Sequence, residues 1–246
     1  MTPESFGRYT LLHRLGKGGM AEVFLAELAT PAGPAKLLAI KRLLPPFSAD
    51  PQIVAMRADE ARLSVWLDHP NVVQVLDFGR VGTTYYLALE YIDGCDLCRL
   101  VRPPSGAGTR ARRPLPLTTA LHVGICIAEA LAHAHGRRTV EGKPIGLIHR
   151  DVSPHNVLVS RDGEIKLADF GLARASTSEH ASHVGVVRGK FSYMPREQAR
   201  GGAIDHRIDI FAAGVTLYET LTGIKPFSSI SLAQQLQQLQ KPVTPP

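Results

Sequence analysis

The stretch from Leu147 to Arg174, LIHRDVSPHNVLVSRDGEIKLADFGLAR, constrains the fold of this chain more than any other. Its apolar runs VLV and IKL predict two short strands, and the Asp-Gly pair at 162–163 predicts a two-residue hairpin turn between them. Such a hairpin places the loop before the first strand next to the loop after the second. We therefore expect three oxygen-bearing side chains of these loops to converge: Asp151, Asn156 and Asp169.

Converging carboxylate and amide oxygens suit a magnesium ion that carries phosphates. Mg²⁺ prefers hard oxygen ligands, and it usually takes one or two of them from protein and the rest from phosphate and water. Two of the three groups could hold the metal while the third accepts a proton. An ordinary polar hairpin with chance matches is the alternative interpretation.

The motifs HRDVSPHN and DFG, in this order, resemble the catalytic loop and the metal loop of eukaryotic-type protein kinases. The resemblance implies that Asp151 is the base that orients the acceptor hydroxyl, and that Asn156 and Asp169 bind Mg²⁺. It also implies that Arg150 docks an activation-loop phosphate, and that Asp209 steadies the backbone of the catalytic loop.

A glycine cluster lies near the N-terminus, in LGKGGMAEVFLAEL, where backbone amides could approach phosphate. No Gly-Lys-Ser/Thr closes it as in a Walker loop, and the segment 22–28 after it looks like strand, unlike a Rossmann turn. The cluster resembles the kinase glycine-rich loop, with Ala21 in place of the third glycine. Along residues 9–94 the resemblance assigns ATP binding to Leu15, Gly16, Lys17, Gly18, Gly19, Val23, Ala39, Lys41, Glu90 and Ile92.

Lys41 is the single charge within the apolar run LLAIK. A buried ammonium needs a partner, because an unpaired buried charge is costly. Glu60 supplies that partner if ADEARLSVWL is a helix, and the 19-residue gap matches the lysine-to-glutamate spacing of the kinases. A surface lysine that snorkels from an edge strand is the alternative.

Two residues of the predicted site depart from the kinase pattern. Kinases that act on Ser or Thr normally have Lys two residues after the catalytic Asp and Thr near the end of the activation segment, where this chain has Ser153 and Lys190. We hypothesise that Lys190 reaches the transferring phosphate while the Ser153 hydroxyl supports Asp151. If the cation is simply lost, activity falls by roughly ten- to a hundred-fold.

The activation segment, rich in Ser, Thr and His, offers phosphate acceptors at Ser176, Thr177, Ser178 and Ser182. It closes with Pro195, Arg196 and Glu197 instead of Ala/Ser-Pro-Glu, and the chain ends soon afterwards, at Pro246.

In the kinase family an arginine further along the chain pairs with the residue that corresponds to Glu197. Without that partner, a buried Glu197 would cost about 3 to 5 kcal/mol. Arg196, Arg207, a partner chain or a second copy could compensate and cover the short C-terminal part.

Composition argues for a globular protein without a nucleic-acid or membrane partner. The 246 residues are 44% hydrophobic, which is enough for a sizeable core. The formal charge is +6, but part of the arginine excess is gathered in residues 102–113, which we interpret as an exposed loop and not as a nucleic-acid groove. No apolar run approaches the roughly 18 residues of a membrane span, and the N-terminus has no signal-peptide pattern, so we expect a cytoplasmic protein.

Two further features concern cysteine and helix content. Cys95 and Cys98 form a CxxC pair, which could be half of a zinc site. A structural zinc site needs four ligands and only Cys126 remains among the thiols, so we expect three ordinary reduced cysteines. Residues 117–135 have helical spacing and are apolar on most faces, which predicts a buried helix.

Together these features predict an α+β, bilobal protein-kinase-like fold over residues 9–246, similar to the bacterial eukaryotic-type serine/threonine kinases and short at its C-terminus. A small antiparallel sheet lobe with one main helix (about 9–91) is followed by a hinge (about 90–94) and a mostly helical lobe (about 95–246). The implied reaction transfers the γ-phosphate of ATP, with Mg²⁺, to a Ser or Thr hydroxyl of a protein. The alternatives are an ATP-binding pseudokinase or signalling scaffold, and a small-molecule kinase of similar fold.

Overall fold

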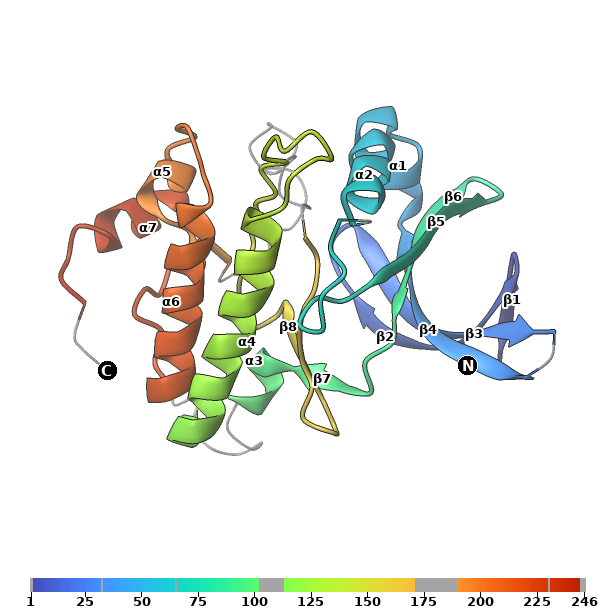
Figure 1. The fold of residues 1–246 in the computed structure, drawn as a ribbon, viewed down its shortest axis with the longest axis horizontal. Helices are drawn as coiled ribbons and strands as arrows, with labels where there is room; N and C mark the ends of the chain where they lie inside the picture. Colours follow the sequence, from blue (N-terminus) through green and yellow to red (C-terminus); the bar gives the residue numbers. More distant parts are fainter. Residues whose placement is uncertain are drawn as a thin grey trace. The chain divides into compact units, whose positions relative to one another are not determined.

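The chain forms two compact units, and Figure 1 labels most of their helices and strands. The computed structural model describes residues 2–31, 33–64, 66–101, 113–170, 190–229 and 231–243, with the backbone alone at Glu60, Ser64 and Lys190. Unit 1 comprises the residues up to Asp68 together with Val73–Tyr91. Unit 2 comprises His69–Val72 and most of the chain from Ile92 onward.

Unit 1 is built on a six-stranded antiparallel sheet in the order β1-β2-β3-β4-β6-β5. Its strands are β1 (Glu4–Phe6), β2 (Tyr9–Lys17), β3 (Ala21–Thr30), β4 (Gly33–Leu43), β5 (Val75–Val81) and β6 (Thr84–Glu90). The predicted antiparallel sheet is thus confirmed. Strand β5 starts at Val75, after a turn in which the Val72 N–H bonds the His69 carbonyl oxygen.

Strand pairing assigns the side chains of this sheet to two faces, because side chains alternate along a strand and directly paired residues share a face. Val23, Lys41 and Leu87 are paired across β3, β4 and β6 and therefore share one face. The opposite face carries a buried apolar cluster made of Phe6, Tyr9, Leu11, Phe24, Ala26, Leu38, Ile40, Tyr86 and Ala88.

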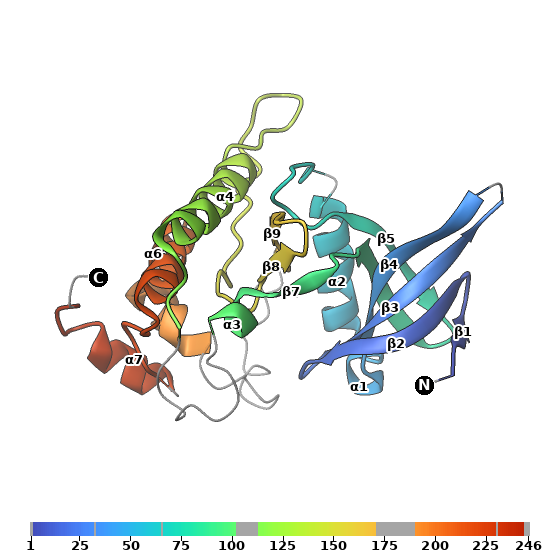
Figure 2. The ribbon, with the colours of Figure 1, turned by 90° about the horizontal axis from the view of Figure 1, so that it is seen from below.

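Helix α2 (Pro51–Ser64) packs beside the sheet, together with the short α1 (Pro45–Ser48) (Figure 2). The Asp50 carboxylate caps α2 by accepting the Gln52 N–H at 2.8 Å, and a proline in the first helical position completes the start signal. The helix therefore begins earlier than the predicted segment ADEARLSVWL.

The face that α2 contacts is the one that carries Lys41. Ile53 of α2 clusters with Ala21 and Leu43, which are paired with each other two positions from Val23 and Lys41. Alternation along the strands puts all of them on the same side of the sheet. Helix α2 therefore packs on the face of the sheet that carries Lys41.

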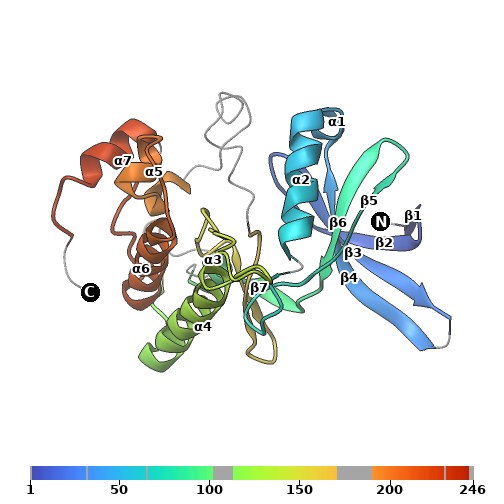
Figure 3. The ribbon, with the colours of Figure 1, turned by 45° about the horizontal axis from the view of Figure 1, so that its top comes forward.

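Unit 2 is centred on α4 (Leu117–His135) and α6 (Arg207–Thr222), which pack side by side (Figure 3). Gly124 permits their close approach, since a Cβ there would lie 3.2 Å from Leu217 Cδ1. Helix α6 ends at Gly223, whose φ of 69° is the left-handed C-cap that glycine adopts readily. The buried face of α4 carries Ala120, Val123, Cys126, Ile127, Ala130, Leu131 and Ala134.

The prediction that α4 is buried on most faces is wrong. Leu117, Leu121 and Ile125 recur every four residues along its other face and are 65%, 46% and 56% exposed. Helix α4 is also, among the described residues, the one helix long and apolar enough by composition to cross a membrane, which corrects the expectation that no segment is. The buried face of α4, opposite Leu117, Leu121 and Ile125, belongs to the core of unit 2.

A three-stranded sheet of β7 (Gly94–Asp96), β8 (Val157–Ser160) and β9 (Ile165–Leu167) carries the predicted hairpin. The β8–β9 pairing is confirmed, but the loop is longer than two residues because the Ser160 N–H bonds the Glu164 carbonyl oxygen and Gly163 has a φ of 88°. Gly94 is required by close approach, since a Cβ there would lie 1.9 Å from the Val159 carbonyl oxygen.

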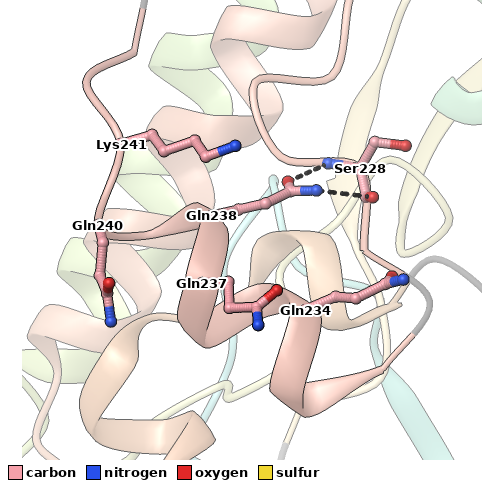
Figure 4. A pocket seen from close by; sticks show the side chains of 6 residues that line it. All are labelled: Ser228, Gln234, Gln237, Gln238, Gln240 and Lys241. Atoms are coloured by element: carbon pink, nitrogen blue, oxygen red, sulfur yellow. Dashed lines mark hydrogen bonds between the residues drawn. The ribbon is translucent and has the colours of Figure 1, made fainter.

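The C-terminal part of unit 2 consists of η3 (Lys190–Tyr193), α5 (Arg196–Ala199) and the glutamine-rich α7 (Leu232–Gln238). Gln235 is fully buried and joins these segments, because its amide accepts from Ser229 Oγ and donates to the Met194 carbonyl oxygen. Gln238 makes two hydrogen bonds with the Ser228 backbone beside a polar pocket of about 630 Å³ (Figure 4).

Candidate active site

The catalytic-loop motif folds as a tight turn in front of β8. The Asn156 N–H donates to the Ser153 carbonyl oxygen at 2.9 Å, with Pro154 in the second position, where its fixed φ suits a turn. The turn directs Asn156 back to Asp151: Asn156 Nδ2 donates to the Asp151 carbonyl oxygen at 2.7 Å and to Asp151 Oδ2 at 3.0 Å. Two of the three predicted site residues are thus in direct contact.

Asp169 lies beside Asn156 because of the β8–β9 register. Val157 pairs with Leu167, and the Ala168 N–H then donates to the Asn156 carbonyl oxygen at 2.8 Å. Asp169 is the next residue after this hydrogen bond. The two loops of the sequence motif therefore meet within unit 2, as the hairpin prediction required.

Asp209, at the start of α6, holds the backbone of the catalytic loop by hydrogen bonds. Its carboxylate is fully buried and accepts the His149 N–H at 2.8 Å and the Arg150 N–H at 2.7 Å. This is the structural role that the resemblance implied. His135 Nε2, at the end of α4, lies 2.8 Å from the same carboxylate.

His149 links the catalytic loop to the metal loop. Its Nε2 lies 2.9 Å from the Ala168 carbonyl oxygen and its Nδ1 accepts the Asp151 N–H at 3.2 Å, which fits the tautomer protonated at Nε2. The imidazole also packs edge-on against Phe170, with the ring centroids 4.5 Å apart. One buried side chain therefore contacts the backbone of Asp151 and both neighbours of Asp169, Ala168 and Phe170.

Two residues of the motifs have unusual backbone geometry. Arg150 and Asp169 have φ of 69° and 65°, and among the described residues they are the only ones other than glycine with positive φ. A residue with a Cβ pays of order 1 to 3 kcal/mol for such a conformation, and it persists only where surrounding contacts enforce it. Here the contacts include the Asp209 carboxylate at Arg150, and Gln198 Nε2, which donates to the Arg150 carbonyl oxygen at 3.0 Å.

Ser153, predicted to support Asp151, makes no such contact. Its side chain is buried, and its Oγ has no hydrogen-bond partner among the described residues. The side chain of Lys190, its predicted counterpart, lies outside the described residues, as do the activation-segment acceptors Ser176, Thr177, Ser178 and Ser182. The hypothesis that Lys190 supplies the cation missing at position 153 therefore stays a prediction.

Unit 1 holds the residues predicted to bind ATP, except Ile92. Lys41 lies in β4, which is flanked by β3 and β6, so the alternative of a lysine on an edge strand is wrong. The side chain of its predicted partner Glu60 lies outside the description, although the backbone of Glu60 is in α2. A Cβ added at Gly16 would meet nothing within 4 Å, which leaves room for a ligand above this part of β2.

The remaining predicted ATP-binding residues lie along the strands of unit 1 and the segment that follows it. Leu15 and Lys17 are in β2, Gly18 and Gly19 in the turn before β3, Val23 in β3, Ala39 in β4, Glu90 at the end of β6 and Ile92 just beyond it.

Glu197 is exposed, which corrects the expectation of a buried, unpartnered carboxylate. The cost of about 3 to 5 kcal/mol that burial would carry therefore does not apply. Of the two arginines proposed as substitutes, Arg207 is near enough for the charge of Glu197 to contribute to raising its pKa, but the larger cause is its hydrogen bond to Asp205. That same hydrogen bond lowers the pKa of Asp205 to about 2.

The donor set of unit 2 fits a hard divalent cation. Asn156 Nδ2 is committed to Asp151, so its Oδ1 remains to face a metal, and the adjacent Asp169 offers carboxylate oxygens. Oxygen-only ligands of this kind suit Mg²⁺.

Comparison with known proteins identifies the family to which this architecture belongs. A family model described as protein kinase domain matches residues 9–244. The chain belongs to the protein kinase family. Members of this family take ATP and typically a divalent metal, and the bilobal α+β kinase fold is the one described above.

Two relatives of this kinase chain come from bacteria. It is 42% identical over 225 residues to the tyrosine-protein kinase MasK of Myxococcus xanthus, covering 92% of this chain and 34% of that protein. It is 36% identical over 239 residues to the serine/threonine-protein kinase PrkC of Bacillus subtilis, covering 96% and 34%. The kinase chain thus spans about a third of the length of these curated relatives.

A solved structure supports the same assignment of the kinase chain. The PknI kinase domain of Mycobacterium tuberculosis has a TM-score of 0.68 and 29% sequence identity, covering 99% of this chain and 81% of the solved one.

Sequence reasoning missed three residues that hold the kinase site together: His135, Gln198 and Asn71. The Asn71 carbonyl oxygen accepts the Leu167 N–H, and Asn71 Nδ2 donates to the Ile165 carbonyl oxygen. Asn71 thus holds β9 in place, although it is far from β9 in sequence. None of the three stands in a recognisable motif, and each contact joins distant parts of the chain. No local signal could have found them.

Proposed function

We propose that this domain is a serine/threonine protein kinase, which transfers the γ-phosphate of ATP to a hydroxyl of a protein. The observation that carries the proposal is the contact of Asn156 with Asp151, together with the β8–β9 register that places Asp169 next to Asn156. A base and two hard-oxygen ligands are thereby gathered in one short stretch of unit 2.

Each residue has a stated role in the proposed reaction. Asp151 accepts the proton of the acceptor hydroxyl, and the Asn156 amide holds the Asp151 carboxylate in place by hydrogen bonding its Oδ2. Asn156 and Asp169 would hold Mg²⁺, which neutralises phosphate charge when it is bound. Lys41, with Glu60 as its proposed partner, would bind the phosphates from unit 1.

A phosphotransfer assay with radiolabelled ATP tests the proposal. Asp151→Asn should lower the rate by about 10² to 10⁴, the usual contribution of a positioned general base. Asp162→Asn, in the exposed hairpin loop, is the matched control and should keep the wild-type rate. Equal background signal from wild type and Asp151→Asn would instead favour an ATP-binding pseudokinase or scaffold. Aminoglycoside and choline acceptors, offered in parallel, test the small-molecule alternative.

The hypothesis that Lys190 replaces the lysine which other kinases have at position 153 has its own test. If Lys190 supplies the missing cation, Lys190→Ala should lower turnover by roughly ten- to a hundred-fold. Unchanged turnover would remove Lys190 from the proposed mechanism.

Tyrosine is a second candidate acceptor. The chain has the small residue Ser153 where kinases acting on Ser or Thr have Lys, and a 42% identical relative is named a tyrosine-protein kinase. A serine there leaves more room beside Asp151 for a phenol ring than a lysine does. Phosphoamino-acid analysis of a protein mixture labelled by the domain decides between the two, since phosphotyrosine in excess of phosphoserine and phosphothreonine would favour this candidate.

The proposed substrates also bear on location and partners. Because ATP is the proposed phosphate donor, we place the domain in the cytoplasm. The partner is a protein substrate. A second copy or a partner chain covering the C-terminal part stays a proposal, which the oligomeric state of the purified domain would test.

A further inference from the structure

A group of three metal-ligating side chains lies in unit 2, apart from the residues assigned to Mg²⁺. Asp96, Cys98 and His155 each offer one ligand atom, and these atoms all lie within 4.8 Å of one another. Asp96 ends β7, Cys98 is in α3 (Leu97–Leu100), and His155 is in the turn before β8. Two segments that are distant in sequence thus supply the three ligand atoms.

The backbone fixes these segments against each other. The Cys98 N–H donates to the Pro154 carbonyl oxygen at 3.1 Å, and β7 pairs with β8 from Gly94–Ser160 to Asp96–Leu158. Main-chain hydrogen bonds therefore hold the backbones that carry the three ligands close together. Cys98 is buried, whereas Asp96 and His155 reach solvent, which leaves an entry path for an ion.

From this group we propose a Zn²⁺ site formed by Asp96 Oδ, Cys98 Sγ and an imidazole nitrogen of His155. A thiolate and an imidazole exclude Mg²⁺ and Ca²⁺, which prefer oxygen alone, and a mixed sulfur, nitrogen and oxygen set suits Zn²⁺. Three protein ligands leave the fourth tetrahedral position to water. Binding takes Cys98 as thiolate and releases its proton to solvent.

The geometry needs only a small contraction. With metal–ligand distances of about 2.0 to 2.3 Å, the ligand atoms of a tetrahedral zinc lie roughly 3.3 to 3.8 Å apart. Rotation of the solvent-accessible His155 and Asp96 side chains can supply the difference.

Arg99 competes with a metal for the Asp96 carboxylate. Its N–H and Nε lie 2.9 and 3.4 Å from the Asp96 carboxylate. The Arg99 side chain is 64% exposed, and exposed ion pairs contribute little, so it can give way to the metal.

This site revises the interpretation of the CxxC pair. The sequence argument rejected zinc because it counted thiols, and a structural site made of thiols alone would lack a fourth ligand. Only Cys98 of the pair takes part, and the histidine comes from the catalytic loop, 57 positions away in HRDVSPHN. Because His155 precedes Asn156, an ion here would also restrain the loop that carries Asn156.

Zinc binding to the purified full chain tests the proposal directly, with Zn²⁺ itself in competition with a chelator, and with Co²⁺ as a spectroscopic probe. We expect one Zn²⁺ per chain and a thiolate-to-Co²⁺ charge-transfer band. Cys98→Ser and His155→Gln should each weaken Zn²⁺ binding by at least about 100-fold, more than the usual loss for an outer-shell partner. Cys95→Ser is the matched control and should bind like wild type.

Three results would overturn the site: no Zn²⁺ uptake at a free concentration of about 10 µM, equal binding by Cys98→Ser and wild type, or equal loss in Cys95→Ser and Cys98→Ser. Circular dichroism checks that Cys98→Ser is folded, and if it is not, the surface variant His155→Gln carries the test alone. Asp169→Asn should leave Zn²⁺ binding unchanged, which separates this site from the Mg²⁺ ligands.

Discussion

Ser153 is the residue at which this chain differs most sharply from the kinase pattern, and its buried hydroxyl lacks a hydrogen-bond partner among the described residues. An unsatisfied buried polar group costs about 1 to 3 kcal/mol. We therefore expect Ser153→Ala to raise the free energy of unfolding by about 1 kcal/mol, measured by urea denaturation. A destabilised variant with reduced phosphotransfer would instead show that the hydroxyl supports Asp151.

Asp209 is the residue on which the backbone of the catalytic loop depends. Asp209→Asn keeps the size of the side chain but turns an N–H group toward the N–H of either His149 or Arg150. One buried donor then loses its acceptor, and the free energy of unfolding should fall by about 1 to 3 kcal/mol. Asp59→Asn removes an exposed ion pair with Arg62 and should change it by no more than about 0.5 kcal/mol. Equal denaturation midpoints for the two variants would contradict the anchoring role.

At the scale of elements, replacing two glycines by alanine should change the stability of the fold in opposite directions. Gly94→Ala would drive a Cβ into the β8 backbone, so β7 must separate from β8 and the variant should be clearly destabilised. Gly214 lies exposed within α6, where a Cβ would meet nothing within 4 Å, so Gly214→Ala should be stabilising by about 0.5 to 1 kcal/mol. Thermal unfolding of both variants checks the pair, and the same sign of change in both would contradict the strand contact.

The sheet of unit 1 should lose stability at high pH. Burial is the largest cause that raises the pKa of Tyr86, followed by its hydrogen bond with Tyr9, and Asp77, which accepts from Tyr86 Oη at 3.1 Å, adds to the shift. The folded state therefore keeps a proton that the unfolded state releases near the ordinary tyrosine pKa of about 10. Stability is present below that pH and is lost as the pH rises above it.

The measurement is the urea midpoint between about pH 8 and about pH 11, on either side of the ordinary tyrosine pKa. Tyr86→Phe should flatten the decline, while Tyr9, whose pKa is also raised by burial, keeps part of it. Tyr85→Phe, the neighbouring tyrosine on β6, is the control for loss of one hydroxyl. A decline that is identical in the two variants would contradict the assignment to Tyr86.

At the scale of the whole molecule, the proposed function requires both units to act on one nucleotide. Mg²⁺-ATP at about 100 times its Kd should stabilise the chain by about 2.7 kcal/mol, or about 5 to 10 °C in Tm. Lys41→Met in unit 1 and Asp169→Asn in unit 2 should each reduce this shift. The controls are Lys36→Met, at the exposed end of β4, and Asp162→Asn. A shift that survives in one of the two site variants would contradict joint binding.

The sequence by itself determined the features that depend on neighbouring residues. The apolar runs VLV and IKL and the Asp-Gly pair predicted the β8–β9 hairpin, and with it the meeting of Asn156 and Asp169, because short apolar runs and turn chemistry act over a few positions. Helix α4 was predicted with its observed bounds for the same reason. Its exposed face was not, because apolar periodicity says which residues are hydrophobic and not which of them another element covers.

Only the tertiary structure decided which distant residues meet. The placement of His135 beside the Asp209 carboxylate, the hydrogen bond of Gln198 to the Arg150 carbonyl oxygen and the approach of His155 to Cys98 all join segments far apart in the chain. Such contacts are selected by the packing of whole elements, and a single hydrogen bond or ligand leaves no periodic pattern in the sequence around it. Local chemistry therefore specified the motifs, and long-range packing specified what surrounds them.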